Sequence, residues 1–145
     1  MTYSERITFL IGQFMEAYQY TLKNAFRFVC LEEAPKPASL ETLEAKEAAA
    51  LPLLCDSEEW SVSQKIAFFT GKGLSEKDFS ALSLLIRKCA FLSVYFFVAN
   101  AKALAREEIA IYESKITELS DYVHKAVELN QRLSKACDGF YSFGK

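Results

Sequence analysis

The chain has 145 residues, of which 51% are hydrophobic and 14% aromatic, and this composition excludes a disordered or low-complexity protein. Its length suits one domain over residues 1–145, because a chain of this size buries enough surface to form a core of its own. The 17 lysines and arginines and the 19 acidic residues are interspersed and leave a net charge of −2, so the chain lacks the basic stripe that binding to nucleic acid requires.

The N-terminal segment predicts a long helix over residues 3–33. Apolar residues recur there at intervals of three and four, which places them on one face of a helix. They are Ile7, Ile11, Phe14, Tyr18, Leu22, Ala25 and Val29. The segment lacks the basic region, apolar run and cleavage site of a signal peptide, so we expect a cytoplasmic protein. The four scattered cysteines form no C-x-x-C pair, which agrees with reduced thiols.

Two short helices are predicted after a proline-rich turn. Pro35 and Pro37 interrupt the first helix, because proline restricts its predecessor and lacks an amide donor. Residues 39–50 are rich in alanine, leucine and glutamate and predict a short helix that Pro52 ends, with Glu41, Glu44 and Glu47 along a solvated face. Ser61 and Gln64 match a capping box, which predicts another helix over residues 61–70.

Residues 75–137 contain neither glycine nor proline and predict two long helices. Ser75 is suited to cap the first of them. One uninterrupted helix from Ser75 to Asp138 would be about 95 Å long, whereas a compact domain of this size is about 35 to 40 Å across. We therefore expect a bend between Asn100 and Glu108 that separates two antiparallel helices, over about 75–100 and 106–137.

The segment from Cys89 to Ala99 carries apolar side chains around every face of its predicted helix. It is too short to span a membrane, which takes about 20 apolar residues. A helix that is apolar all round must be surrounded, either by the other helices of the chain or by a second chain. If a partner covers it, we expect the contacts to be made by Phe91, Tyr95 and Val98.

The last helix carries a regular apolar repeat that predicts a packing seam. Its members alternate at steps of three and four residues. They are Ile109, Tyr112, Ile116, Leu119, Val123, Ala126, Asn130, Leu133 and Cys137. Asn130 is a candidate for fixing register and oligomeric state, because a buried asparagine can do so in a helical seam; the alternative is a helix end that approaches solvent. Pairs at i,i+4 are expected on the water-facing side, between Asp121 and Lys125 and between Glu128 and Arg132, and Gly139 is expected to cap the helix.

Aromatic residues also dominate the C-terminal tail, where Phe140, Tyr141 and Phe143 follow the last helix. Chain ends are usually frayed and polar, so these rings are expected to dock. They either fold back onto the chain itself or insert into a groove of a partner.

Catalytic and metal-binding patterns find little support in the sequence. The single histidine, His124, has Asp121 three residues earlier, but helical di-iron sites need such a pair on each of two helices. A lone surface histidine is also a poor basis for a nucleophilic triad. The Gly71–Gly73 turn is too short for a phosphate-binding loop and follows no strand. We therefore expect neither an enzyme nor a bound metal or cofactor.

The sequence thus predicts an all-α helical bundle that acts as a protein-protein interaction module and self-associates. An adaptor, a chaperone-like factor or a subunit of a larger assembly would fit. One alternative is a small-molecule binder or enzyme with a pocket lined by aromatic residues such as Phe14, Tyr18 and Phe96. A second is a subunit of a nucleoprotein complex that uses two basic pairs, Lys23 with Arg27 and Arg87 with Lys88.

Overall fold

The computed structural model describes residues 1–94, 96, 100, 105 and 109–142. Throughout this described part of the chain the regular structure is helical, and the predicted all-α class is confirmed. The elements are α1 (Tyr3–Glu32), α2 (Leu40–Ala48), α3 (Ala50–Asp56), the short 3₁₀ helix η1 (Ser57–Glu59), α4 (Val62–Phe69), α5 (Glu76–Val94) and α8 (Ile109–Gly139).

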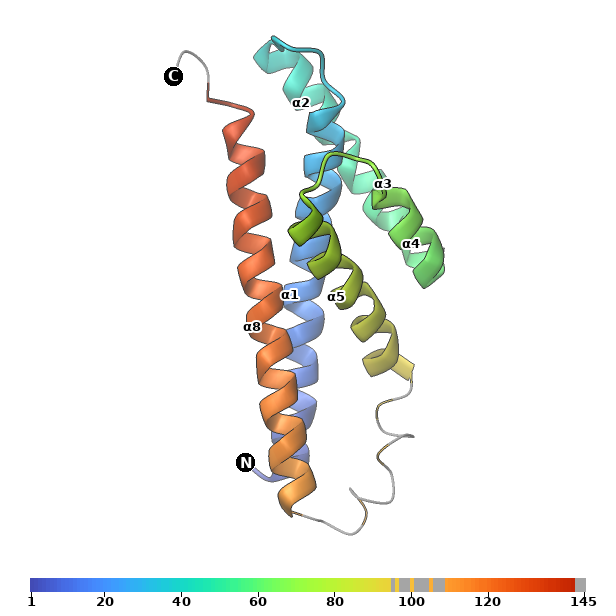
Figure 1. Ribbon diagram of the computed structural model, residues 1–145, viewed down its shortest axis with the longest axis vertical. Coiled ribbons are helices and arrows are strands. Elements are labelled where there is room, and N and C mark those ends of the chain that lie inside the picture. The colour runs from blue at the N-terminus through green and yellow to red at the C-terminus, as the bar shows by residue number, and fades with distance from the viewer. Residues whose placement is uncertain (95, 97–99, 101–104, 106–108, 143–145) are drawn as a thin grey trace.

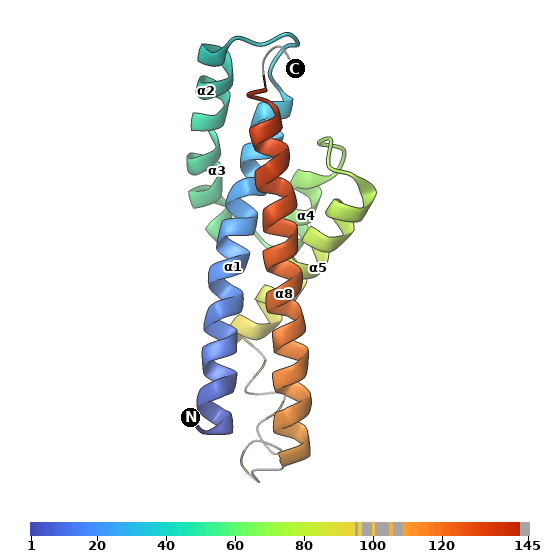
Figure 2. The same ribbon diagram turned by 90° about the vertical axis from the view of Figure 1, so that its left-hand side faces the viewer.

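Helices α1 and α8 form the long axis of the molecule and run in the same direction (Figures 1 and 2). Helix α5 runs in the opposite sense and is inclined across one side of this pair, while α2, α3 and α4 lie along the upper part of α1. The antiparallel arrangement expected for the two helices of residues 75–137 is therefore confirmed. The bend expected between them falls mostly on residues outside the described part of the chain.

Local capping interactions fix where several helices begin. The Ser61 hydroxyl accepts from the Gln64 amide, and the Gln64 side chain accepts from the Ser61 amide, so the predicted capping box is present. The Ser75 hydroxyl accepts from the Asp78 amide, as expected. The sequence analysis missed a further capping box, which Thr2 and Glu5 form at the start of α1. Each box satisfies amides that a helix start leaves without partners.

The main core joins α1 to α3, α4, α5 and α8. The predicted apolar face of α1 supplies much of it, since Phe14 and Ala25 are fully buried and Tyr18 is nearly so. The rings of Phe26, Trp60, Phe68 and Phe69 pack beside this face with centroids 4.9 to 6.0 Å apart, and they attach α4 to α1. A smaller apolar cluster lies apart from the main core, where α1, α2 and the end of α8 meet.

Several local predictions were wrong. Pro52 does not end helical structure but lies in the first turn of α3, where its missing amide is no loss. Helix α8 runs through Gly139 instead of stopping before it. Arg132 pairs with Asp78 of α5, so the expected pair with Glu128 is absent, and Glu128 pairs with His124.

Three further predictions have mixed outcomes. The pair between Asp121 and Lys125 is present, with Nζ 3.0 Å from the carboxylate. Ile109, expected in the packing seam, is instead 58% exposed. Glu47, expected on a solvated face, is half-buried in a polar network with α1. Within the described residues, every helix is too short or too polar to cross a membrane.

Candidate functional site

Two contacts near the upper ends of α1 and α8 define the register of one helix against the other. Asn24 Nδ2 donates to Asn130 Oδ1 at 2.6 Å, and the Thr21 hydroxyl donates to the carbonyl of Ala126 at 3.0 Å. Because residue numbers rise together in these two contacts, residue n of α1 lies at about the level of residue n + 106 of α8. Two rows of residues spaced by seven therefore face each other, since seven residues make nearly two helical turns. The rows are Tyr3, Leu10, Ala17 and Asn24 on α1, and Ile109, Ile116, Val123 and Asn130 on α8.

Helix α5 covers one flank of these rows. The Sγ of Cys89 lies 3.5 Å from the Sδ of Met15 on α1. Lys88 donates to Glu118 on α8 at 2.7 Å, and its Nζ also lies 4.6 Å from the ring centroid of Tyr122. The hydrogen bond from Lys88 holds the pKa of the Glu118 carboxyl below its ordinary value. This flank is closed by apolar contact and by charge pairing together.

In the part of the chain that the structure describes, the opposite flank of the same pair of helices is uncovered. At 100° per residue, Tyr20 and Val127 project from the side of the rows away from Met15 and Tyr122. They lie at the same level of the pair, and they are 55% and 39% exposed. Figure 2 looks onto this flank, and no helix of the described part of the chain lies over the lower halves of α1 and α8. We call this surface, which is the seam between the two helices, the α1–α8 groove.

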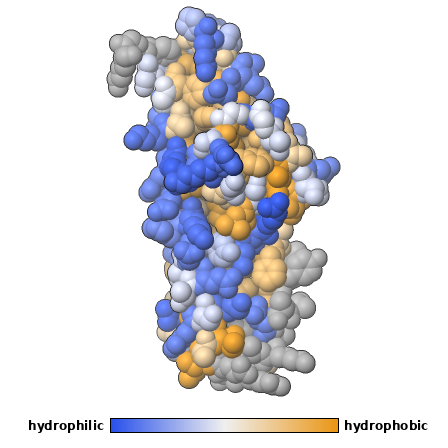
Figure 3. All heavy atoms as spheres, in the orientation of Figure 1, coloured by the Kyte–Doolittle hydropathy of each residue, from blue (hydrophilic) through white to orange (hydrophobic). Residues whose placement is uncertain are grey.

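The floor of the α1–α8 groove is apolar. Leu10, Ala17 and Val123 are only half-buried although they pack against the main core, while Ile116 is 9% exposed. At its lower end a hollow of about 510 Å³ is lined by Thr2, Tyr3, Ser4, Ile109 and Tyr112. The space-filling view in Figure 3 shows apolar surface at this lower end of the molecule.

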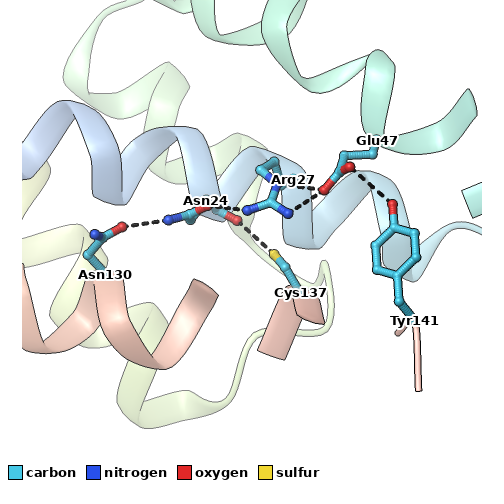
Figure 4. Close-up of polar contacts among 6 residues, drawn as sticks. All are labelled: Asn24, Arg27, Glu47, Asn130, Cys137 and Tyr141. Carbon is cyan, nitrogen blue, oxygen red and sulfur yellow. Dashed lines mark hydrogen bonds and ion pairs between the residues drawn. The ribbon is translucent and has the colours of Figure 1, made fainter. Parts of the chain in front are cut away.

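A polar network closes the upper end of the α1–α8 groove (Figure 4). Asn24 links to Asn130 through its amide nitrogen, and its carbonyl oxygen accepts from the Arg27 guanidinium at 2.7 Å. Arg27 also forms an ion pair with Glu47 of α2, whose other carboxylate oxygen accepts from the Tyr141 hydroxyl at 3.0 Å. The network therefore connects α8, α1, α2 and the C-terminal tail in one chain of contacts.

The candidate residue Asn130 has its partner within the same chain. Its side-chain oxygen accepts from Asn24 across the α1–α8 contact. This pairing provides an acceptor for the Asn24 amide nitrogen and a donor for the Asn130 side-chain oxygen, and it fixes the register of one helix against the other. A role of Asn130 in oligomeric state stays a prediction, while the observed contact accounts for its position in the seam.

The aromatic tail contacts its own chain in the described residues. The ring of Phe140 packs edge-on against Phe28 with centroids 5.7 Å apart, and Tyr141 bonds to Glu47. Burial, and then the bond to the Glu47 carboxylate, raise the pKa of Tyr141 to about 12. Of the two docking modes left open by the sequence, the intramolecular one is thus the one present here; Phe143 lies outside the described residues.

The apolar segment of α5 is only partly enclosed. Leu92 and Phe96 are 4% and 3% exposed, whereas Phe91 is half-buried and its ring centroid lies 4.9 Å from the Nζ of Lys88. Tyr95 and Val98, the other two residues expected to face a partner, lie outside the described residues.

The residues named for the alternative functions are engaged elsewhere. Phe14, Tyr18 and Phe96 are at most 3% exposed and belong to the main core. Two of the four basic residues are in ion pairs, Arg27 with Glu47 and Lys88 with Glu118.

Neither a cluster of metal-binding side chains nor similarity to a known protein assigns a function to the described part of the chain. Groups of three or more histidine, cysteine or acidic side chains placed to bind a metal are absent from the described part of the chain. Comparison of the chain with protein-family models, with curated proteins and with solved structures gives no match.

The sequence analysis missed the residues that line the α1–α8 groove on α1. The signal was present, because Tyr3, Leu10, Ala17 and Asn24 repeat at seven residues in the first helix as Ile109 to Asn130 do in the last. Only a matching of the two repeats would have shown that the helices are parallel and in register.

Proposed function

We propose that the chain is a protein-protein interaction module whose docking surface is the α1–α8 groove. The observation that supports this most directly is the half-exposed apolar floor, on a flank that no described helix covers. Tyr20 and Val127 stand at its edge at 55% and 39% exposure. Apolar surface that is grouped in this way favours a binding site over the isolated apolar residues common on any protein.

The shape of the α1–α8 groove favours an amphipathic helix as its occupant. Its paired rows repeat about every 10.5 Å, which is the distance that seven residues of a helix cover. An occupant with apolar residues at i, i+3 or i+4 and i+7 would place one turn against each pair. Gln13 and Ser120 are exposed and carry no charge, so burying them costs less than burying ions.

Self-association is the simplest form of this function. The α1–α8 groove presents apolar residues at its lower end and in its middle, so the same surface of a second copy is chemically complementary to it there. Covering Tyr20 and Val127 would remove the exposure on both copies at once. Phe91 lies on α5, on the other side of the pair of helices, and it stays a separate proposed contact together with Tyr95 and Val98, which lie outside the described residues.

A matched pair of charge substitutions tests the proposal. Val127→Glu places a carboxylate at the edge of the α1–α8 groove, while Leu84→Glu places one on α5 at a position that is also 39% exposed. Both variants are expected to unfold within a few degrees of the parent chain, because both sites face water.

Light scattering over a range of concentrations, followed by capture from the native lysate with all three chains as bait, measures association. Val127→Glu is expected to weaken self-association or capture of a given protein by at least about tenfold, while Leu84→Glu keeps it. Equal behaviour of the two variants would contradict the proposal.

A further inference from the structure

A second surface, separate from the α1–α8 groove, is the small apolar cluster where α1 and α2 meet. We call it the elbow. Its buried members are Leu31, Ala34, Leu43 and Cys137, and half-buried Phe28, Ala38, Phe140 and Tyr141 surround them. A hollow of about 320 Å³ lies against it, lined in part by Leu31, Leu43 and Phe140. The elbow therefore has its own apolar centre, independent of the main core.

The tail reaches the elbow through two side chains. The amides of Phe140 and Tyr141 donate only to carbonyls at the end of α8, those of Cys137 and Asp138. The contacts with the elbow are apolar packing against its buried members, the ring of Phe140 against Phe28, and the hydroxyl of Tyr141 on Glu47. Both tail residues are half-buried, so lifting the tail breaks few interactions and leaves α8 intact.

The receiving side of the elbow is held in place without the tail. Glu47 is paired with Arg27, which is itself bonded to Asn24 on the same helix. Its free oxygen is thus already oriented for a hydroxyl donor. Phe28 and Leu31 belong to a helix that is anchored in the main core, so the apolar wall also stays in position when the tail leaves.

We infer that the elbow is a docking site for a peptide segment in which an aromatic residue is followed by a tyrosine, and that the chain's own tail occupies it as an internal competitor. The bound tail defines the chemistry of the partner, since one aromatic ring packs against Phe28 and the next residue's phenol donates a hydrogen bond to Glu47. A partner segment of this kind must displace Phe140 and Tyr141. Binding is therefore weak while the tail is seated and strong once it is removed.

How strongly the tail competes with a free peptide follows from its covalent attachment to the chain. A segment joined by a short linker acts at an effective concentration in the millimolar range. A free peptide with a dissociation constant of about 100 μM for the empty elbow would then bind the closed chain at least about tenfold more weakly. This difference is the quantity to measure.

The test uses a fluorescein-labelled synthetic peptide with the sequence of residues 138–145 as the probe. Fluorescence polarisation is recorded against the full chain and against a chain ending at Gly139. We expect saturable binding to the shortened chain and binding at least about tenfold weaker to the full chain. Failure to bind either chain, or equal binding to both, would overturn the inference.

Two controls keep the result specific and guard against a folding defect. A full-length Phe140→Ser, Tyr141→Ser chain empties the elbow without shortening the protein, and it must gain the same binding even where the shortened chain unfolds. A probe peptide with Tyr141→Phe should bind the chain ending at Gly139 more weakly than the unchanged probe does. The two peptides should bind equally to the same chain carrying Glu47→Leu, which has no acceptor for the hydroxyl. Loss of binding through Val127→Glu instead would place the peptide in the α1–α8 groove and refute the elbow site.

Discussion

The two flanks of the α1–α8 pair differ in what the sequence places on them. The flank under α5 carries long side chains that reach across, such as Lys88 to Glu118 and Arg132 to Asp78. The uncovered flank carries the uncharged side chains of Gln13, Ala17 and Ser120 beside exposed Tyr20 and Val127, and the charged Arg6 and Glu113 stand nearer its lower end. The same two helices thus present one flank that α5 covers and one flank with apolar side chains that no described helix covers.

Removing a large side chain from each region should give the sharpest contrast. Phe14 is fully buried, and its ring packs against Tyr18 and Tyr122. Phe14→Ala is expected to lower the free energy of unfolding by about 3 to 5 kcal/mol, because it leaves a cavity in the core. Val127→Ala on the open flank should change it by less than about 0.5 kcal/mol. Urea denaturation of both variants checks this, and a large loss at Val127 would mean that the open flank contributes to the fold.

The covered part of the fold could be predicted from the sequence because burial leaves a periodic pattern. Ile7, Phe14 and Tyr18 recur at helical spacing, and all three are buried. The capping pair Ser61 and Gln64 is a local signal and needed no tertiary knowledge. What failed were predictions in which a local rule competed with a distant partner. Arg132 has Glu128 one turn away but reaches Asp78 on α5.

The open flank could not be predicted in the same way. A row such as Leu10 and Ala17 looks like core in the sequence, whether or not another helix lies over it. Its exposure depends on where α5 packs, and this is set by Met15 and Lys88 through contacts with residues 74 and 30 positions away. The docking of the tail was equally hard to predict. The sequence indicates that Tyr141 docks, but no local pattern identifies Glu47, 94 residues away, as its hydrogen-bond acceptor.

The pair of Asn24 and Asn130 lies between the two flanks, and substitutions there should change the free energy of unfolding by less than Phe14→Ala does. Asn24→Leu leaves Asn130 without its partner, and Arg27 keeps only Glu47, which should cost about 1 to 3 kcal/mol. Replacing both asparagines with leucine removes the unpaired amide of Asn130, so most of that cost should be recovered. A double-mutant cycle in urea measures the coupling, which is expected at about 1 to 2 kcal/mol. Additive effects would show that the contact between the two amides does not help to set the register.

The smallest expected effect concerns charge on the covered flank. The pKa of Glu118 is lowered chiefly by the hydrogen bond from Lys88, so its contribution to stability is present above the ordinary carboxyl pKa and is lost as the pH falls through the lowered one. Because the side chain is 37% exposed, solvent screens the pair, and Glu118→Gln should cost no more than about 1 kcal/mol at pH 7.

Unfolding of the Glu118→Gln variant and the parent should converge below about pH 4, where carboxyl groups begin to be protonated. Asp121→Asn is the matched control, since its pair with Lys125 is largely in water, and it should change stability little at either pH. A cost for Glu118→Gln that stays constant down to pH 3 would show that the side chain acts through packing against α5 and not through its charge. The covered flank would then resemble the open one, with apolar contact as the main force on both sides of the helix pair.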